Sequence, residues 1–188
     1  MKTRQAIIPG LILSILSLTL ATNWIASPHV LWQSSSSINQ DETTSSTSQA
    51  TNLSQSFPSS IQIWKDLIIS TASQHNLDPN LIAAVILQES GGDASAYSSS
   101  GAVGLLQVMP RDGLASEFIC GSTPCFQSRP SIQELFDPQF NIAFGTQMLS
   151  GLFNHYGNWR EALRAYGPMD VGYDYADIVL SIYENYRS

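Results

Sequence analysis

The sequence predicts an all-α, or mainly α, domain that follows a separate N-terminal segment and a linker. From Ile61 onward, apolar residues recur every three or four positions through several stretches, which is the spacing of one face of a helix. Helix starts are marked by Asp78 and Asp137, each followed by proline, because aspartate caps free N–H groups and proline suits the first helical position. No stretch alternates convincingly like a strand, although a small hairpin is an option for residues 119–126.

Residues 1–33 predict an export segment. Lys2 and Arg4 precede residues 7–25, which are mostly apolar and close to the roughly 20 residues needed to span a bilayer. Positive residues before such a stretch predict that the N-terminus stays inside and that the rest is exported. Cleavage as a signal peptide, near the small residues 19–21, and retention as a membrane anchor both stay open. Either outcome makes the protein extracytoplasmic: secreted, in the periplasm or cell wall, or anchored to the membrane.

Residues 34–60 predict a disordered linker. They are rich in Ser, Thr, Gln and Asn and include the runs SSSS and TTSSTS. A segment with so little apolar surface cannot offset the chain entropy that is lost on folding. We therefore expect a flexible tether here and a folded domain that covers residues 61–188.

The helices of the domain are delimited by capping residues, glycines and apolar spacing. Gly157 ends a long helix, and Asn158 with Glu161 three residues later forms a pattern like a capping box. The expected helices cover residues 61–75, 78–90, 137–156, a stretch that begins at residue 158, and 174–186.

Glu89 is the first candidate for chemistry. It lies on the apolar stripe of its helix, four residues after Val85 and three after Ile86, and Gly91 ends the helix just behind it. Partial desolvation and the negative end of the helix dipole both favour the protonated carboxyl. A carboxyl that stays protonated near neutral pH is suited to general acid catalysis.

A glycine-rich segment follows, and its composition lets the backbone approach a ligand or another element closely. Residues 101–110 read GAVGLLQVMP, with two glycines and a small residue near Gln107. A tight glycine-rich turn would be weak evidence for a functional site on its own. Here it follows a helix-terminal Glu-Ser pair at a short distance, and the combination is strong evidence.

Further motifs follow in a fixed order. They are Glu89-Ser90, Ser98, Gly101-Ala102-x-Gly104-Leu105-x-Gln107-x-Met109-Pro110, Asp137-Pro138, Asn141-Ile142, Gly145 and Ala162-Leu163-x-Ala165-Tyr166. With these residues the chain resembles the lytic transglycosylases of the soluble-transglycosylase (SLT) family, over roughly residues 61–186. The resemblance implies a lysozyme-like domain that acts on peptidoglycan.

The resemblance also implies roles for individual residues. Glu89 matches the catalytic acid and base of the family, and Tyr166 matches a tyrosine whose hydroxyl points towards that glutamate. The positions that match the lining of the sugar cleft are Ser90, Ser98, Gln107, Met109 and Tyr166, although a helix-end serine such as Ser90 is often only a backbone cap.

The chain departs from the family after Tyr166. The family usually continues Tyr-Asn-Ala-Gly-Pro, whereas here Tyr166 is followed directly by Gly167. The function of the missing asparagine must be carried out otherwise, and Tyr173 or Tyr175 could supply a replacement hydroxyl.

Cys120 and Cys125 bracket a turn-rich tetrapeptide. In an exported chain with only two cysteines we expect them to form a disulfide. No histidine lies near this pair and the three histidines show no ligand spacing, so we expect no metal site and no cofactor.

The charge of the chain disfavours nucleic acid as a partner. Eight basic and 15 acidic residues give a net charge of −7, and a phosphate backbone needs a basic face. We expect peptidoglycan glycan strands as the partner, membrane contact only through the N-terminal segment, and a monomer.

The reaction that these features predict needs only one carboxylate. Most glycosidases use two, and the nearest candidates in sequence, Asp93, Asp112 and Glu117, resemble turn or surface residues. The resemblance implies that one glutamate acts first as acid and then as base, cleaving the MurNAc–GlcNAc β-1,4 bond with formation of 1,6-anhydro-MurNAc. The alternatives are a peptidoglycan-hydrolysing muramidase and a catalytically weak peptidoglycan-binding module.

Overall fold

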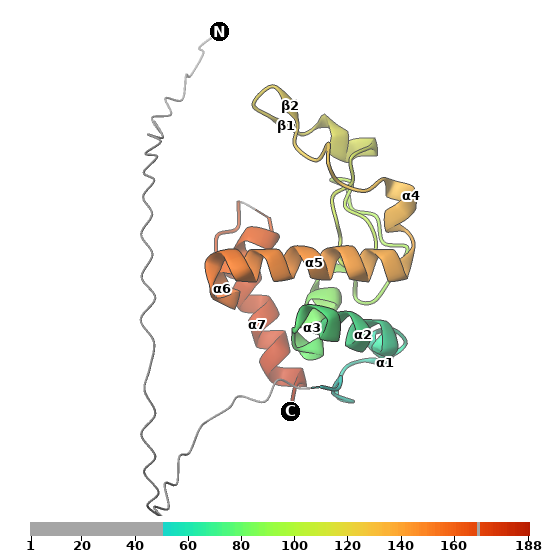
Figure 1. The fold of residues 1–188 in the computed structure, drawn as a ribbon, viewed down its shortest axis with the longest axis vertical. Coiled ribbons are helices and arrows are strands. Elements are labelled where there is room, and N and C mark those ends of the chain that lie inside the picture. The colour runs from blue at the N-terminus through green and yellow to red at the C-terminus, as the bar shows by residue number, and fades with distance from the viewer. Residues whose placement is uncertain (1–50, 169) are drawn as a thin grey trace, which may run out of the picture. The chain divides into compact units, whose positions relative to one another are not determined.

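The computed structural model describes residues 51–168 and 170–188, and this part of the chain is mainly α-helical, as the sequence predicts (Figure 1). The elements, in order, are α1 (Ser59–Gln62), α2 (Lys65–His75), α3 (Pro79–Ser90), the 3-10 helix η1 (Gly113–Glu117), β1 (Ile119–Cys120), β2 (Thr123–Pro124), α4 (Ile132–Leu135), α5 (Pro138–Tyr156), α6 (Trp159–Tyr166) and α7 (Asp174–Tyr186).

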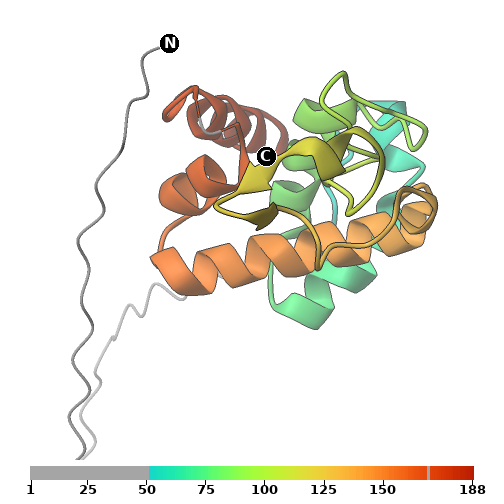
Figure 2. The ribbon, with the colours of Figure 1, turned by 90° about the horizontal axis from the view of Figure 1, so that it is seen from above.

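Helix α3 forms the centre of the hydrophobic core. Every residue from Pro79 to Ile86 is buried, so this helix is enclosed on all sides rather than on one face. It packs against α2 and α7, while α5 packs against α2 and α6. Figures 1 and 2 show α5 running across the domain, and Figure 1 shows the β1–β2 hairpin at the end of the domain opposite the C-terminus.

Several helix ends lie where capping chemistry predicts them. The side chain of Asp78 accepts a hydrogen bond from the Asn80 N–H, and the side chain of Asp137 accepts one from the Phe140 N–H. Gly157 ends α5 in the left-handed conformation with φ 74°. These features confirm the predicted bounds of the helices that carry Glu89 and the long apolar stripe.

Two helix details differ from the expectation. The stretch predicted as one helix over residues 61–75 is divided, because α1 ends at Gln62 and α2 begins at Lys65. The turn between them places Trp64 so that its indole N–H donates to the Gly92 carbonyl at 2.9 Å. Asn158 caps α6 as predicted, but the reciprocal capping box is found at α4, between Ser131 and Glu134.

The hairpin and the disulfide are both present. Strands β1 and β2 pair antiparallel, and Cys120 is bonded to Cys125 across their turn. The four strand residues are exposed, so the disulfide closes a loop that has little core of its own.

The folded domain begins before Ile61, which corrects the predicted end of the linker. Leu53 and Phe57 are each only 3% exposed, and the Phe57 ring stacks on Tyr186 with centroids 4.9 Å apart. Two apolar side chains within a polar run show no periodicity, so the sequence pattern gave no sign of their burial. The export segment and residues 34–50 of the predicted linker lie outside the described residues.

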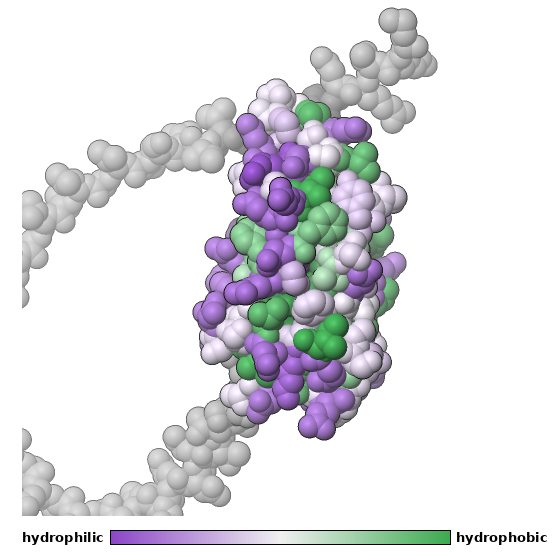
Figure 3. Space-filling view, turned by 90° about the vertical axis from the view of Figure 1, so that its right-hand side faces the viewer, coloured by the Kyte–Doolittle hydropathy of each residue, from purple (hydrophilic) through white to green (hydrophobic). Residues whose placement is uncertain are grey.

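Two further findings concern the surface of the described part. None of its helices is both long enough and apolar enough to cross a membrane. On the face that lies at the right-hand side of Figure 1, apolar residues are interspersed with polar ones (Figure 3).

Candidate active site

Glu89 lies in the last turn of α3, at the edge of the buried core. Its side chain is partly buried, and this burial raises its pKa from the usual 4.5 to about 7, against a smaller opposing effect of a hydrogen bond from Tyr175. The expectation of a raised pKa is therefore confirmed. Near neutral pH this carboxyl exists as a mixture of acid and carboxylate, so it can donate a proton and accept one.

Tyr175, in α7, is the direct partner of Glu89. Its hydroxyl donates to Glu89 Oε1, and the side chain is only 6% exposed. Burial and the neighbouring carboxylate raise the pKa of this hydroxyl, so it remains a donor. The sequence suggested Tyr173 or Tyr175 as a replacement hydroxyl for the asparagine missing after Tyr166; of the two, Tyr173 donates to Glu161.

Gly167 makes room for the ring of Tyr175. A Cβ atom at this position would lie 2.5 Å from Tyr175 Cγ, which is too close for any side chain. The position at which the family motif continues with asparagine is therefore occupied here by a residue that has to be glycine.

Tyr166 lies beside the same site. Its hydroxyl donates to the Leu106 carbonyl at 2.7 Å, whereas the hydrogen bond to Glu89 comes from Tyr175. Burial and the charge of Glu89 both raise the pKa of Tyr166, which shows that the two side chains are close. The buried Leu106 carbonyl needed a donor, and no sequence pattern reveals that need.

The glycine-rich segment is held against α5 by one buried side chain. Asn141 donates to the carbonyls of Val103 and Leu135, each at 2.9 Å, and accepts from the Leu106 N–H at 2.8 Å. Gly104 has φ 73°, and a Cβ there would lie 2.8 Å from the Leu135 carbonyl oxygen. The close approach predicted for this segment is thus confirmed, and it is an approach to both α4 and α5.

Gln107 follows in a left-handed conformation, with φ 43°. Its Nε2 donates to the carbonyls of Gly104 at 3.0 Å and Ala96 at 3.3 Å, which fixes the orientation of the amide. Within the described residues no donor is bonded to its Oε1, so this oxygen keeps its capacity to accept a hydrogen bond.

The remaining predicted contact residues differ in how available they are. The Ser90 hydroxyl donates to the Leu105 carbonyl at 2.9 Å and accepts from Gly92, so it closes the helix end and has little capacity for substrate. Ser98 Oγ accepts from the Ala102 N–H at 2.9 Å, which leaves its own proton for another acceptor. Met109 is partly buried between the buried residues Val108 and Pro110.

Among the described residues, no neighbouring carboxylate shifts the pKa of Glu89. The two causes of its shift are burial and the hydrogen bond from Tyr175. Asp93 is exposed and accepts from the N–H and hydroxyl of Ser95, as a turn residue does. Asp112 is exposed and accepts from the Ile132 N–H, and Glu117 is exposed. In residues 51–168 and 170–188 no three potential ligand side chains come together as a metal site.

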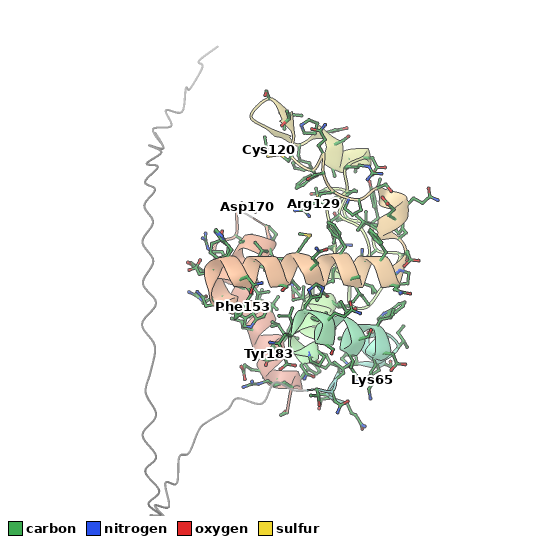
Figure 4. The ribbon with its side chains drawn as sticks, in the orientation of Figure 1. Lys65, Cys120, Arg129, Phe153, Asp170 and Tyr183 are labelled. Carbon is green, nitrogen blue, oxygen red and sulfur yellow. A yellow bond between two sulfur atoms is a disulfide. The ribbon has the colours of Figure 1, made fainter. Side chains whose placement is uncertain are left out.

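Arg129 is a residue that the sequence did not indicate. It is partly buried, and Figure 4 places it between the β1–β2 hairpin and α5. Its charge lowers the pKa of Tyr166, the same hydroxyl whose pKa Glu89 raises. No motif marks it in the sequence, because it is one of six basic residues scattered through the domain.

Comparison with known proteins gives a consistent result. The model of the transglycosylase SLT domain family matches residues 66–171, a range that contains Glu89 and Tyr166 but ends before Tyr175. Membrane-bound lytic murein transglycosylase E of Buchnera aphidicola is 37% identical over 97 residues, which are 52% of this chain and 42% of the relative. Endo-type membrane-bound lytic murein transglycosylase A of Klebsiella pneumoniae is 35% identical over 91 residues, which are 48% of this chain and 43% of the relative.

Two further similarities cover parts of the chain. A transglycosylase of Enterobacteria phage PRD1 is 32% identical over 103 residues, which are 55% of this chain and 34% of the relative. A solved structure of an inactive variant of lytic transglycosylase Slt from Pseudomonas aeruginosa aligns with a TM-score of 0.49 at 25% identity, covering 64% of this chain and 23% of that one. The chain spans less than half the length of the curated relatives that it matches.

Proposed function

Because this chain belongs to the transglycosylase SLT domain family, we propose that it is a peptidoglycan lytic transglycosylase, which cleaves the MurNAc–GlcNAc β-1,4 bond and leaves 1,6-anhydro-MurNAc ends. The observation that carries this proposal is a single partly buried carboxyl, Glu89, whose pKa lies at about 7 and whose Oε1 is held by Tyr175. Such a carboxyl suits a reaction in which one group must be acid and base in turn.

In the first step the protonated Glu89 gives its proton to the glycosidic oxygen. Tyr175 occupies Oε1, so the proton to be donated is carried by Oε2. As the bond between MurNAc C1 and this oxygen breaks, the oxygen leaves as the hydroxyl of the departing sugar. The N-acetyl oxygen of the MurNAc residue assists from the opposite side of C1, which is the role that a second carboxylate has in most glycosidases.

In the second step the Glu89 carboxylate takes the proton of the C6 hydroxyl of the same MurNAc residue. The C6 oxygen then forms a bond to C1 and displaces the N-acetyl oxygen, which closes the 1,6-anhydro ring. Glu89 ends the cycle protonated, so no water molecule is consumed. The hydrogen bond from Tyr175 stabilises the carboxylate between the two steps.

Polar and apolar side chains near the glycine-rich segment would hold the sugar. Gln107 Oε1 offers an acceptor for an acetamido N–H or a hydroxyl, and the Ser98 hydroxyl offers a donor. Met109 would supply an adaptable apolar wall. The Ser90 hydroxyl is already committed to backbone partners, so we assign it to the helix end rather than to substrate.

We further propose that the protein works outside the cytoplasm, tethered by its N-terminal segment. Two of the relatives are named membrane-bound, and the charge pattern of residues 1–33 predicts export.

Product analysis tests the proposed reaction. The full-length protein is incubated with purified sacculi and the released fragments are weighed by mass spectrometry. Anhydro ends, one water lighter than reducing ends, are the expected result. Reducing ends would identify a muramidase, and binding to sacculi without any release would identify a binding module; either finding overturns the proposal.

A further inference from the structure

Arg129 differs from the other arginines of the described part in having no acidic partner. Each of the others forms an ion pair: Arg111 with Glu134, Arg160 with Asp177, Arg164 with Glu161, and Arg187 with Glu184. The domain carries more acidic than basic residues, so carboxylates are not scarce. The lack of a carboxylate beside Arg129 is therefore a specific feature of this position.

The surroundings of Arg129 leave most of its hydrogen-bonding capacity unused. The guanidinium has five N–H donors, and the structure gives one contact, from Nη1 to the Met148 Sδ at 3.0 Å. A thioether is a weak acceptor, and the Phe126 ring, 5.6 Å from the guanidinium carbon, contributes only a cation–π attraction. Burial lowers the pKa of this guanidinium, which indicates that water solvates it only in part.

The position of Arg129 is fixed by its backbone. Its N–H donates to the Phe126 carbonyl at 2.9 Å, and its carbonyl accepts from Arg111 at 3.2 Å. Its side chain extends towards α5, where Met148 lies (Figure 4). These bonds fix the backbone from which the guanidinium extends, while the side chain itself is held only by the contact with Met148.

Arg129 and Glu89 lie near the same backbone segment. Next to Glu89, the Ser90 hydroxyl donates to the Leu105 carbonyl. The following Leu106 packs against Gly145, one helical turn before the Met148 that Arg129 contacts. Arg129 is not among the causes that shift the pKa of Glu89, so its charge does not serve to tune the acid. A partly desolvated cation near a sugar-cleaving acid, unpaired in the free protein, points to an anion supplied by the substrate.

We propose that Arg129 binds a carboxylate of the glycan substrate and thereby makes the site selective for anionic glycans; this inference rests on the proposed function. Planar guanidinium groups bind carboxylates through two parallel hydrogen bonds. Peptidoglycan offers this group from two sources: the lactyl arm of MurNAc, where the peptide has been removed, and the peptide stem, where it is present. A chitin-type chain of GlcNAc alone has no carboxylate.

The test compares Arg129→Met with Arg187→Met, a control that removes an equivalent charge at the far, C-terminal end of α7. Three glycans are used: peptide-free and peptide-bearing glycan as substrates, and neutral GlcNAc oligosaccharides, which lack the MurNAc–GlcNAc bond, as competitive inhibitors. Arg129→Met should raise KM for the carboxylate-bearing glycans roughly tenfold or more and leave the inhibition constant of the neutral oligosaccharides unchanged. An effect on peptide-free glycan identifies the lactyl carboxylate, and an effect confined to peptide-bearing glycan identifies the stem. Arg187→Met should change none of the three.

A binding measurement separates this inference from the proposed reaction and avoids reliance on one variant. Calorimetry with Glu89→Gln protein compares glycan fragments before and after their carboxyl groups are converted to amides. Tighter binding of the untreated fragments supports the inference, even if turnover gives a product other than the expected one. Arg129→Lys should lose part of this affinity, because lysine keeps the charge but not the planar guanidinium that forms two parallel hydrogen bonds. Equal affinity for both fragments, or an Arg129→Met defect of equal size on neutral and anionic glycans, overturns it.

Discussion

At the scale of single residues, two opposing influences bring the pKa of Glu89 near neutrality, which suits this carboxyl to the two proton transfers proposed for it. Burial at the end of α3 raises the pKa of Glu89, and the hydrogen bond from Tyr175 limits the rise. A fully exposed glutamate would be ionised at neutral pH, and one buried without a donor would hold its proton too strongly to act as a base.

Replacing Tyr175 by phenylalanine tests this balance. The hydrogen bond from Tyr175 lowers the pKa of Glu89, so its removal in Tyr175→Phe should raise that pKa. The alkaline limb of the kcat/KM profile should therefore move from about pH 7 to higher pH. Loss of orientation should also lower kcat roughly tenfold or more. Tyr173→Phe is the matched control, since Tyr173 donates to Glu161 and should leave the limb in place. An unchanged limb in Tyr175→Phe would contradict the assignment.

The raised pKa also predicts how stability depends on pH. The folded state binds a proton at Glu89 more tightly than the unfolded chain, so this carboxyl favours the fold below pH 4.5, and that contribution is lost as the pH rises through about 7. The free energy of unfolding of Glu89→Gln relative to wild type should therefore increase across this window, by at most about 1.4 kcal/mol per pH unit. Denaturant titrations at several pH values measure this difference.

A control with the opposite sign accompanies that measurement. Hydrogen bonds from Ser131 lower the pKa of Glu134, so its contribution to stability is present above the usual pKa of 4.5 and is lost as the pH falls below it. Glu134→Gln should differ from wild type by a constant amount above about pH 5. A flat difference for Glu89→Gln as well would show that its pKa is not raised.

The sequence predicted the position of Glu89 more reliably than its hydrogen-bond partner. Helical periodicity fixes which side of α3 Glu89 occupies. The partner of its Oε1 comes from α7, 86 residues away, and depends on how α3 and α7 pack. Tyr166, which was expected to point towards Glu89, donates to the Leu106 carbonyl, and Arg129 could be recognised only from what surrounds it.

At the scale of secondary-structure elements, the glycine-rich segment is positioned by a single residue of α5. Asn141 bonds three backbone groups of buried segments, and two of them, the Leu106 N–H and the Leu135 carbonyl, have no other partner among the described residues, whereas the Val103 carbonyl also accepts from Val108. Gln107 lies directly after this anchored stretch, so the orientation of its amide depends on Asn141 as well as on its own bonds to Ala96 and Gly104.

Asn141→Ala should therefore destabilise the domain and weaken activity together. Each of the two buried groups left without a partner costs about 1–3 kcal/mol, so we expect a loss of at least about 2 kcal/mol in the free energy of unfolding. Asn185→Ala, on the exposed side of α7, is the control and should change stability by less than about 0.5 kcal/mol. A near-neutral Asn141→Ala would show that the segment is held by other contacts.

Element bounds were predictable where local chemistry sets them. The Asp-Pro starts of α3 and α5 and the glycine after α5 act through neighbouring backbone groups, which a sequence displays directly. The break between α1 and α2 was not predictable, since the contact made by Trp64 with Gly92 joins residues 28 positions apart.

At the scale of the whole molecule, the domain is larger than the helical pattern suggested. The segment before α1 contributes Leu53 and Phe57 to the core, and the Ser54 N–H donates to Asn80 Oδ1 at 2.8 Å. A fragment of residues 51–188 should fold, whereas one of residues 61–188 should lose about 1.5–3 kcal/mol for each of the two buried side chains. Thermal unfolding of the two fragments compares them, and equal stability would return the boundary to Ile61.

The central claim is that one carboxyl, Glu89, carries out both proton transfers. Its most direct test is the turnover of purified sacculi by Glu89→Gln beside Asp93→Asn, Asp112→Asn and Glu117→Gln, each verified as folded. The amide at position 89 cannot protonate the leaving oxygen, so we expect a loss of at least roughly 100-fold there. The other three variants should keep most of their activity, because their side chains are exposed. Turnover of Glu89→Gln within a few-fold of wild type, or an equally complete loss in any of the other three, would contradict the claim.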